Sequence, residues 1–595
     1  MTGAIRKGCE LTLNLYRETG GEGDFSAEIC YFVLFQDGVE PTVYLMEKTD
    51  FGFSLSLRFN RTGLYFYYFD FGHVKLGCGQ LHKSIETSGI QPWQLTVFEE
   101  EYATPDWMKG GVMYQIFPDR FYRASGDYAL APNKILRDDW GGQPNYRPNE
   151  LGKVLNNDFF GGNLKGVIEK LDYLASLKVS VIYFNPIFEA YSNHRYDTGD
   201  YMKIDPLLGT TEDFDQLIAE AEKRGIKVIL DGVFNHTGDN SRYFNKYGQY
   251  DALGAYQSPD SPYFDWYRFR AFPESYESWW GIETLPAVNE ASLSYQNFIL
   301  GNDGVLKTWL RHGIGGYRLD VADELPDFFL QKLRNAVKEE NPEAVIIGEV
   351  WEDASNKISY DVRRQYFQGR ELDSVMNYPL KDAIIHFVRV GTTALLRETM
   401  AMLLDNYPKA SLDCLMNSLG THDTPRILTV LGNKACRDKD EMAVTSLTDE
   451  EATRAKEKVR MAAVLQYTLP GVPCVFYGDE IGMQGYMDPF CRGCYTWDKA
   501  DEALRAFYKK LGEIRTELFP DIFKDGEYRE IFADTTCIVY ERRKDDRCVI
   551  AYVNNSSCEY IINLQERAYI EHITGERHSK TLKIKPFSYG ILSKS

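Results

Sequence analysis

The chain has 595 residues, 44% hydrophobic and 26% charged, a composition typical of globular proteins and a length that suggests about three or four domains. Its net charge of −20 and pI near 5.1 argue against nucleic acids and anionic membranes as partners. The amino terminus lacks the apolar core of a signal peptide, no apolar run reaches the length of a membrane span, and the 11 cysteines are scattered, so we expect a cytoplasmic protein.

The first part of the chain, residues 1–104, carries short segments in which apolar and polar residues alternate. ELTLNLY (10–16), GLYFYYFDF (63–71) and WQLTVFEE (93–100) are examples, and turn residues separate them. This alternation predicts an N-terminal β-sandwich. Such a domain could bind glycan like a carbohydrate-binding module, form a dimer interface or shield the next domain, and the sequence leaves these alternatives open.

Residues 105–516 alternate between apolar runs typical of buried parallel strands and segments with helical spacing. VMYQIF (112–117), SVIYFNP (180–186) and KVILDG (227–232) are the first three such runs, and EDFDQLIAEAEKRGI (212–226) is a helical segment between two of them. Strands that alternate with helices in this way indicate an α/β domain built on a parallel sheet.

Two stretches depart from this alternation. Residues 236–290 are rich in Tyr, Trp, Pro and Ser, and a connection of this length is too long for a bare loop, so we predict an inserted subdomain after the third strand. Its Trp279 and Trp280 are either part of the subdomain core or a platform for sugar rings. From residue 517 to 595 the β-alternation returns and predicts a C-terminal β-sandwich.

Four apolar runs of the α/β region end in ionisable residues: DGVFNH (231–236), GYRLDVADE (316–324), GEVWED (348–353) and LGTHDTPR (419–426). Functional residues at the carboxyl ends of several strands indicate a (β/α)₈ barrel. In the second motif, Arg318 and Asp320 are two positions apart on a strand, so they project to the same side. A guanidinium beside a carboxylate keeps it ionised, as a nucleophilic carboxylate requires.

These four motifs, in this order, resemble those of the α-amylase superfamily, glycoside hydrolase family 13. The stretches YQIFPDRF (114–121), SNHRYDTGDY (192–201), WWGIETLPAVNE (279–290) and DPFCRGCYTW (488–497) resemble the group of neopullulanases, cyclomaltodextrinases and amylopullulanases. The resemblance covers roughly residues 105–520. It implies a multidomain protein whose central (β/α)₈ TIM barrel stands between the N-terminal and C-terminal β-sandwiches.

The resemblance also implies roles for individual residues. Asp320 would be the nucleophile, Glu349 the general acid and base, and Asp423 the carboxylate that stabilises the transition state. Two carboxylates acting as nucleophile and acid predict a covalent glycosyl-enzyme and retention of configuration. Stacking on the sugar, hydrogen bonding and orientation of the nucleophile would fall to a substrate-binding set formed by Tyr196, Asp231, His236, Arg318, His422, Trp351, Glu324, Asp488 and Arg492.

The calcium site of many relatives has only weak counterparts here, Asp127 and Asn163. Because hard cations favour several carboxylate oxygens, we expect that no cofactor is required and that calcium at these two residues is a minor alternative.

The resemblance implies a hydrolase of α-1,4, and also of α-1,6, glucosidic bonds in maltodextrins, pullulan, cyclodextrins or starch fragments. A transglycosylase with the same covalent intermediate is the main alternative. A non-catalytic glycan-binding barrel is disfavoured because all three carboxylates are present, and function follows the site and not the fold. Expected partners are α-glucan oligosaccharides or polysaccharides, with neither nucleic acid nor membrane; a homodimer through the N-terminal sandwich is suggested by analogy.

Overall fold

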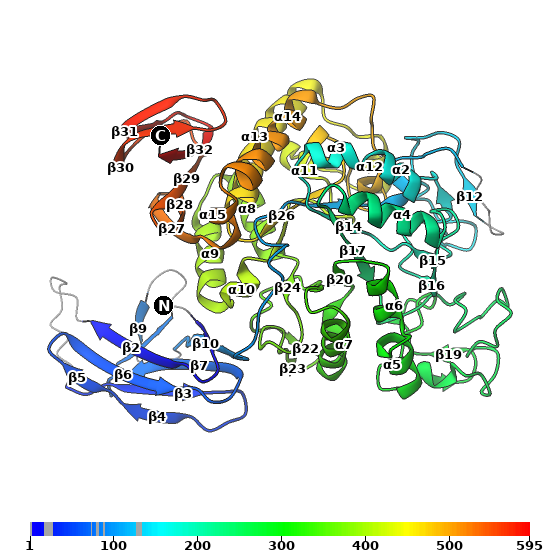
Figure 1. Ribbon diagram of the computed structural model, residues 1–595, viewed down its shortest axis with the longest axis horizontal. Coiled ribbons are helices and arrows are strands. Elements are labelled where there is room, and N and C mark those ends of the chain that lie inside the picture. Colours follow the sequence, from blue (N-terminus) through cyan, green and yellow to red (C-terminus); the bar gives the residue numbers. More distant parts are fainter. Residues whose placement is uncertain are drawn as a thin grey trace.

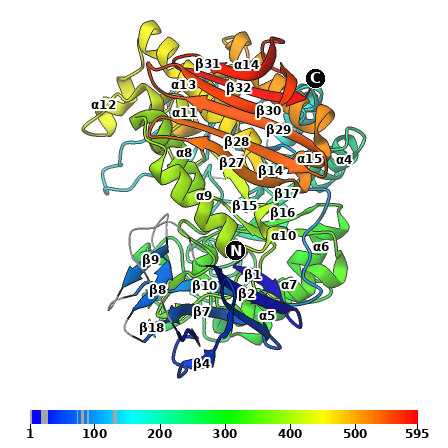
Figure 2. The same ribbon diagram turned by 90° about the vertical axis from the view of Figure 1, so that its left-hand side faces the viewer.

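The computed structural model describes residues 3–16, 28–72, 74–78, 83–86, 90–126 and 134–594. A central barrel forms the largest part of the molecule, and the N-terminal strands (blue) and the C-terminal strands (orange to red) both lie on one side of it (Figures 1 and 2). Among the described residues, no helix combines the length and the apolarity that crossing a bilayer requires.

The N-terminal domain is a sandwich of two antiparallel-rich sheets, as predicted. One sheet runs in the order β1 (Ala4–Arg6), β10 (Trp93–Phe98), β7 (Gly63–Asp70), β3 (Tyr31–Phe35) and β4 (Thr42–Leu45), and β8 (Lys75–Cys78) pairs with β7 and with β9 (Lys83–Glu86). The other sheet consists of β2 (Glu10–Tyr16), β6 (Gly52–Arg58) and β5 (Glu47–Thr49). Their inner faces enclose an apolar core in which Phe32, Tyr67 and Phe69 are in ring contact.

Eight parallel strands form the predicted (β/α)₈ barrel. Their order around the barrel is β11 (Met113–Ile116), β14 (Val181–Phe184), β17 (Lys227–Gly232), β20 (Gly316–Leu319), β21 (Val345–Gly348), β24 (Ser374–Val375), β25 (Met416–Ser418) and β26 (Val472–Phe476). A parallel bridge between Met376 and Met416 joins the sixth strand to the seventh and so closes the barrel. Side chains such as Met113, Ile229 and Ile347 fill its interior.

Helices surround the barrel and connect its strands (Figure 1). Two of them begin with a full capping box, Thr210 with Asp213 in α4 and Thr448 with Glu451 in α13, which satisfies the free amides of the first turn. The helices are α1 (Pro118–Phe121), α2 (Leu164–Glu169), α3 (Leu171–Ser176), α4 (Thr211–Glu222), α5 (Leu293–Leu300), α6 (Val305–Arg311), α7 (Asp327–Glu340), α8 (Tyr378–Val390), α9 (Ala394–Asn406), α10 (Lys409–Leu412), α11 (Ile427–Gly432), α12 (Lys439–Val444), α13 (Asp449–Thr468), α14 (Glu502–Glu513) and α15 (Pro520–Asp525).

The stretch after β17 is folded, as the length argument predicted. Its buried aromatic residues Tyr243, Phe244 and Trp266 belong to the core shared with the barrel, and a β-bridge between His236 and Ala287 joins its two ends. Short strands lie within and around it and in other loops: β12 (Ile135–Leu136), β13 (Asp158–Phe159), β15 (Phe188–Ala190), β16 (Thr198–Ile204), β18 (Phe269–Ala271), β19 (Ser275–Tyr276), β22 (Ile358–Ser359) and β23 (Val362–Arg363).

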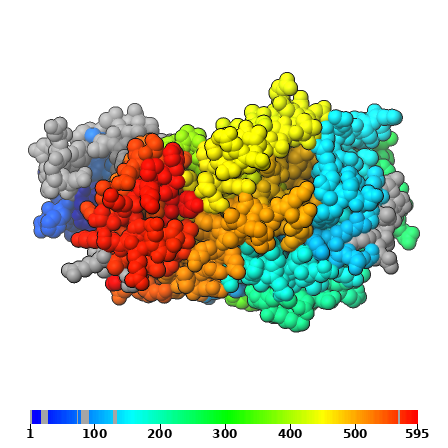
Figure 3. Space-filling model, turned by 90° about the horizontal axis from the view of Figure 1, so that it is seen from above, coloured from blue at the N-terminus to red at the C-terminus, as the bar shows by residue number. Residues whose placement is uncertain are grey.

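The C-terminal strands form one continuous antiparallel sheet. Its order is β27 (Glu527–Ala533), β28 (Cys537–Lys544), β29 (Arg547–Asn554), β32 (Ser588–Lys594), β30 (Tyr560–Glu571) and β31 (Arg577–Ile584). Along β28, Ile538 and Tyr540 belong to the core shared with the barrel, whereas Cys537 and Val539 belong to a separate core of this domain. The sheet therefore buries both of its faces, and Figure 3 shows the domain (red) lying against the barrel.

The buried Arg515 joins the amino ends of the first and last barrel strands. Its Nε donates to the carbonyl of Gly111, just before β11, its Nη1 donates to Tyr467 at 2.6 Å, and its Nη2 donates to Gly471, just before β26. The Arg515 guanidinium thus supplies hydrogen-bond donors to main-chain carbonyls that the strand pairing leaves without a partner.

We expect R515A to destabilise the barrel by about 3 kcal/mol or more, because buried carbonyls lose their donors and a cavity replaces the side chain. R437A, at an exposed helical ion pair with Glu441, is the control and should change stability by less than about 0.5 kcal/mol. Urea unfolding followed by tryptophan fluorescence measures both, and equal midpoints for the two variants would refute this role of Arg515.

Candidate active site

A cavity of about 970 Å³ opens at the carboxyl ends of the barrel strands. Ten of the twelve side chains that the sequence assigned to the site line it: Tyr196, His236, Asp320, Glu324, Glu349, Trp351, His422, Asp423, Asp488 and Arg492. The other two, Asp231 and Arg318, are fully buried beneath its floor. The structure therefore brings together all twelve residues from loops and strands that are far apart in the sequence.

Arg318 lies beneath the cavity floor and is completely buried. Its Nη1 lies 2.8 Å from Asp231 Oδ1 and 2.9 Å from Asp320 Oδ1, and its Nη2 lies 2.7 Å from Glu349 Oε2. Strand register explains this convergence, because Asp231 pairs with Arg318 across β17 and β20, and Glu349 follows the last paired residue of β21. One guanidinium thus orients the proposed nucleophile and the proposed acid.

Asp320 and Glu349 are close neighbours with a shared cation. Burial raises the pKa of Asp320 well above its usual range, and the charges of Glu349 and Asp231 add to this, while Arg318 opposes it. Three carboxylates thus face one guanidinium, and these surroundings favour the protonated form of Asp320. A pair with one ionised and one protonated carboxyl is what an attacking nucleophile and a proton donor require.

Glu349 is held in place from two further directions. The backbone amide of Val321 donates to its Oε2 at 2.9 Å, and Trp351 Nε1 donates to its Oε1 at 3.1 Å. Val321 adopts a φ of 40°, a left-handed conformation that is strained for a β-branched residue. This strained turn directly follows Asp320 and directs an amide at Glu349, so the two carboxylates are positioned by the same backbone segment.

Asp423 lies at the other side of the cavity in a positive environment. His422 Nε2 is 3.0 Å from its Oδ2, and Arg492 Nη2 is 3.2 Å from its Oδ1. Burial disfavours the ionised form, but His422, Arg492 and Arg318 together outweigh it and hold the pKa of Asp423 below its usual range. Arg492 is itself oriented by Asp488 at 2.8 Å, so these residues form one network that keeps Asp423 charged.

Tyr196 and His422 form a fixed pair at the wall of the cavity. Their rings are parallel, with centroids 5.2 Å apart and planes at 8°. The Tyr196 hydroxyl donates to Asp231 Oδ2 at 2.8 Å, and Gln115 Nε2 lies 2.9 Å from His422 Nδ1. If Gln115 is the donor there, His422 keeps its proton on Nε2, the nitrogen that faces Asp423 and Tyr196.

His236 is the predicted residue with an unused polar atom. Its Nδ1 contacts Asn235 Oδ1 at 3.3 Å, whereas its buried Nε2 has no hydrogen-bond partner. Burial lowers the pKa of His236 to about 4, so the ring is neutral at physiological pH. A neutral imidazole with a free nitrogen at the cavity wall is suited to hydrogen bonding with a sugar hydroxyl.

This geometry agrees with a comparison of the sequence with family models. Residues 115–517 match the family model described as alpha amylase, catalytic domain. The chain belongs to the alpha-amylase family. It is 37% identical to an amylopullulanase of Thermoanaerobacterium saccharolyticum, over 83% of this chain and 41% of that protein, and 35% identical to neopullulanase 2 of Thermoactinomyces vulgaris, over 83% and 79%.

A solved structure, the type III pullulan hydrolase from Thermococcus kodakarensis, aligns with this alpha-amylase family protein with a TM-score of 0.70 and 26% identity. The alignment covers 100% of this chain and 98% of the hydrolase chain. The likeness therefore includes the domains on both sides of the barrel. The chain spans about two fifths of the amylopullulanase that it matches.

Several cavity residues of this alpha-amylase family protein were not predicted. Tyr360 and Lys357 come from the loop after β21, and Asp323 from the turn after Asp320; the sequence left Trp280 undecided between core and platform. In the structure Trp280 is 78% exposed and lines the cavity, so it is not part of the subdomain core. For Tyr360 the sequence offered no signal, because its loop carries none of the motifs.

Of the two weak calcium candidates, Asp127 lies outside the described residues. The Asn163 side chain caps α2, where its oxygen accepts the amide of Gly166 at 2.7 Å, and its nitrogen donates to the carbonyl of Ala124. Within the ranges that the structure describes, no three His, Cys, Asp or Glu side chains converge as a metal site.

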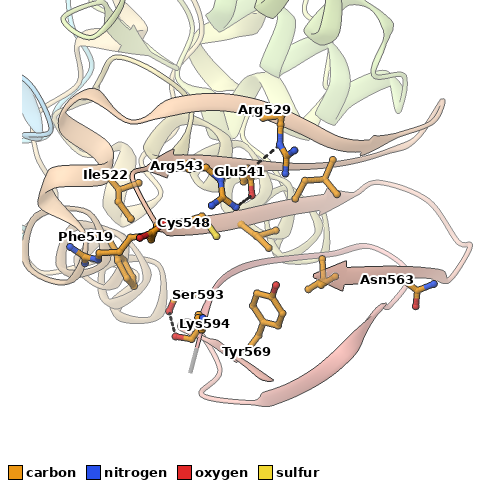
Figure 4. Close-up of a pocket in the computed structure, with 15 residues that line it drawn as sticks. Phe519, Ile522, Arg529, Glu541, Arg543, Cys548, Asn563, Tyr569, Ser593 and Lys594 are labelled. Atoms are coloured by element: carbon orange, nitrogen blue, oxygen red, sulfur yellow. Dashed lines mark hydrogen bonds and ion pairs between the residues drawn. The ribbon is translucent and has the colours of Figure 1, made fainter. Parts of the chain in front are cut away.

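A second cavity of about 250 Å³ lies in the C-terminal domain (Figure 4). None of the predicted site residues lines it. Its carboxylate Glu541 is already paired with Arg529 at 2.8 Å and with Arg543 at 3.0 Å. Without a free carboxylate pair, this cavity lacks the chemistry that the barrel cavity provides.

His194 gives the site a measurable pH dependence of stability. Burial, aided by Arg492, lowers its pKa to about 3. In the unfolded chain, where a histidine pKa is near 6.5, His194 binds a proton as the pH falls, whereas in the folded protein it remains neutral. Stability therefore falls as the pH drops below about 6.5.

We expect the wild type to lose about 2 kcal/mol more stability than H194Q between pH 7 and pH 5. Urea unfolding at the two pH values measures this difference. H578Q, in the C-terminal sheet, is the matched control and should show the wild-type loss. An H194Q protein that loses as much as the wild type would contradict the neutral, buried state of His194.

Proposed function

We propose that the protein is a retaining α-glucan hydrolase that cleaves α-1,4, and also α-1,6, glucosidic bonds. The observation that carries this proposal is the attachment of Asp320 and Glu349 to opposite nitrogens of the buried Arg318, with Asp423 facing the same cavity. The relatives named amylopullulanase and neopullulanase support α-glucans as substrates. Maltodextrins, pullulan, cyclodextrins and starch fragments are the candidates.

In the first step, Asp320 attacks the anomeric carbon while Glu349 gives its proton to the glycosidic oxygen. The glycosidic bond breaks, the second sugar leaves with the protonated oxygen as its new hydroxyl, and a covalent glycosyl-enzyme forms. The glycosidic oxygen accepts a hydrogen bond from protonated Glu349, and this favours the shared proton on Glu349 and the negative charge on Asp320. Arg318 keeps both groups oriented during the exchange.

In the second step, Glu349 accepts a proton from water, and the oxygen attacks the anomeric carbon and releases Asp320. Two inversions restore the original configuration. Asp423, which its positive neighbours keep ionised, accepts hydrogen bonds from sugar hydroxyls that bring the ring toward the oxocarbenium-like transition state. The ring of His422 and the free Nε2 of His236, which accepts from a sugar hydroxyl because Nδ1 donates to Asn235 Oδ1, also line the cavity.

A transglycosylase is the second candidate, because it uses the same glycosyl-enzyme but a sugar replaces water. The aromatic side chains Trp280, Trp351 and Tyr360 line the cavity and favour retention of a sugar acceptor. The retained carboxylates argue against a non-catalytic binding protein.

Incubation with pullulan, followed by chromatography of the products, tests the proposal. We expect panose if α-1,4 bonds are cleaved and maltotriose if α-1,6 bonds are cleaved. E349Q should lower the rate by more than about a thousandfold. The control E371Q changes a buried carboxyl outside the cavity whose pKa burial raises to about 8, and it should retain activity. A wild type inactive on every α-glucan would refute the function.

We also propose that hydrolysis requires no metal. Each proton transfer and each stabilised charge above is assigned to a side chain, so we expect dialysis against EDTA to leave the rate on maltodextrin unchanged. A loss of activity that calcium restores would contradict this and would direct attention to Asp127 and Asn163.

A cytoplasmic location and a homodimer complete the proposal. The 11 cysteines are scattered along the sequence, which supports a reducing compartment, and cell fractionation would test it. The dimer is proposed through the N-terminal sandwich by analogy, and light scattering of the purified protein would test it.

A further inference from the structure

A buried amide, that of Gln115, lies among apolar residues in the interior of the barrel. Gln115 stands two positions after Met113 on β11, so its side chain points into the interior that Met113 and Ile347 fill. It is completely buried, and barrel interiors are normally filled by bulky apolar side chains. A polar group in such a place costs stability unless hydrogen bonds compensate it, so the partners of this amide explain its presence.

Gln115 belongs to a closed ring of hydrogen bonds that reaches the catalytic cavity. Its Nε2 donates to Asn185 Oδ1 at 3.0 Å and lies 2.9 Å from His422 Nδ1. Asn185 Nδ2 donates to the Tyr196 hydroxyl at 2.9 Å, and that hydroxyl lies 2.5 Å from His422 Nε2. Tyr196 and His422 line the cavity, whereas Gln115 and Asn185 are buried behind them.

Carboxylates at two points of the ring determine which atoms donate. Asp231 Oδ2 accepts the Tyr196 hydroxyl at 2.8 Å. That hydroxyl has only one proton, so its oxygen is the acceptor toward Asn185 and His422. On the other side, His422 Nε2 lies 3.0 Å from Oδ2 of the ionised Asp423, which can only accept. Both constraints place a proton on His422 Nε2.

The same constraints determine the orientation of the Gln115 amide. Because Asn185 gives its nitrogen to Tyr196, its oxygen must face Gln115, which therefore presents its own nitrogen. The second hydrogen of that nitrogen points to His422 Nδ1, which must then be an unprotonated acceptor. Gln115 Oε1 has no hydrogen-bond partner among the described residues, so the amide acts as a double donor although its acceptor stays unsatisfied.

We propose that Gln115 and Asn185 are positioning residues that keep His422 neutral, with its single proton on Nε2, beside the catalytic cavity. The inference rests on the proposed function and adds two buried residues to it. Which nitrogen of a histidine ring holds the proton is set by the hydrogen bond at the other nitrogen, and here a donor at Nδ1 excludes a proton there. Asp423 already has one cationic partner, Arg492. An imidazolium would form a second ion pair with Asp423 and would compete with the sugar hydroxyls for that carboxylate.

Nitrogen NMR of the full-length protein labelled with nitrogen-15 histidine reads the protonation state of His422 without any substrate. The His422 signals are identified by their absence from H422Q. In the wild type at neutral pH we expect a protonated Nε2 and an unprotonated Nδ1. Q115E, which places a carboxylate at Nδ1, should give the doubly protonated ring. N185L frees the Gln115 amide to turn its oxygen toward Nδ1 and should give a mixture of the two states.

Kinetics on maltodextrin test the consequence for the reaction. Q115M keeps the length of the side chain but donates no hydrogen bond. We expect it to lower kcat by about tenfold and to change KM less, since Asp423 acts mainly on the transition state. Q466M is the matched control: Gln466 is also buried, donates from Nε2 at 2.9 Å to the carbonyls of Asn417 and Cys474, outside the cavity, and leaves its Oε1 unsatisfied. It should lose about as much stability as Q115M and keep the kcat of the wild type.

A doubly protonated His422 in the wild type, or an unprotonated Nδ1 in both Q115E and N185L, would overturn the positioning role. Equal kcat values for Q115M and Q466M, each corrected for its folded fraction, would overturn it as well. If Q115M does not fold, N185L supplies the same comparison. A wild type with the expected His422 signals but no activity on any α-glucan would refute the proposed function and would still confirm the neutral ring.

Discussion

The structure of the site depends on the complete burial of one guanidinium. Arg318 has no access to water, so its charge must be compensated by protein groups, and the carboxyl groups of Asp231, Asp320 and Glu349 lie at distances of 2.7 to 2.9 Å. Burial and the neighbouring carboxylates raise the pKa of Asp320, while the guanidinium fixes where each carboxylate points. The proposed nucleophile and the proposed acid are thus both carboxyl groups that one cation orients.

Parallel-strand register made this arrangement predictable from the sequence. The period of two along a strand placed Arg318 and Asp320 on one side, and the ends of neighbouring parallel strands placed Asp231 and Glu349 beside them. The apolar runs also predicted the barrel and both β-domains, because buried strands leave strong patterns. The continuous C-terminal sheet was less predictable, because alternation identifies strands but not which strands pair.

Interactions between loops could not be predicted in the same way. Tyr360 contacts Glu324 across 36 positions of sequence, and its hairpin carries no motif that indicates a cavity. The left-handed φ of Val321, Trp280 and Tyr360 has no sequence signal either, since none of them is glycine. These positions are enforced by tertiary contacts, such as the amide of Val321 on Glu349, and local propensity does not reveal them.

Two groups of cavity residues make different kinds of contact, charged hydrogen bonds in one group and aromatic surfaces in the other. This difference explains why the two groups come from different parts of the chain. At Asp423, His422 and Arg492 the contacts are charged and directional, so they come from short loops that rigid strands hold in place. Around Trp351, Trp280 and Tyr360 the contacts are broad aromatic surfaces whose spacing matters more than their exact angles. Such surfaces can be carried by an inserted subdomain and a hairpin, provided that a neighbouring domain restrains them. Arg363 of the hairpin contacts Asp37 and Phe66, so the N-terminal sandwich is the domain that restrains the hairpin.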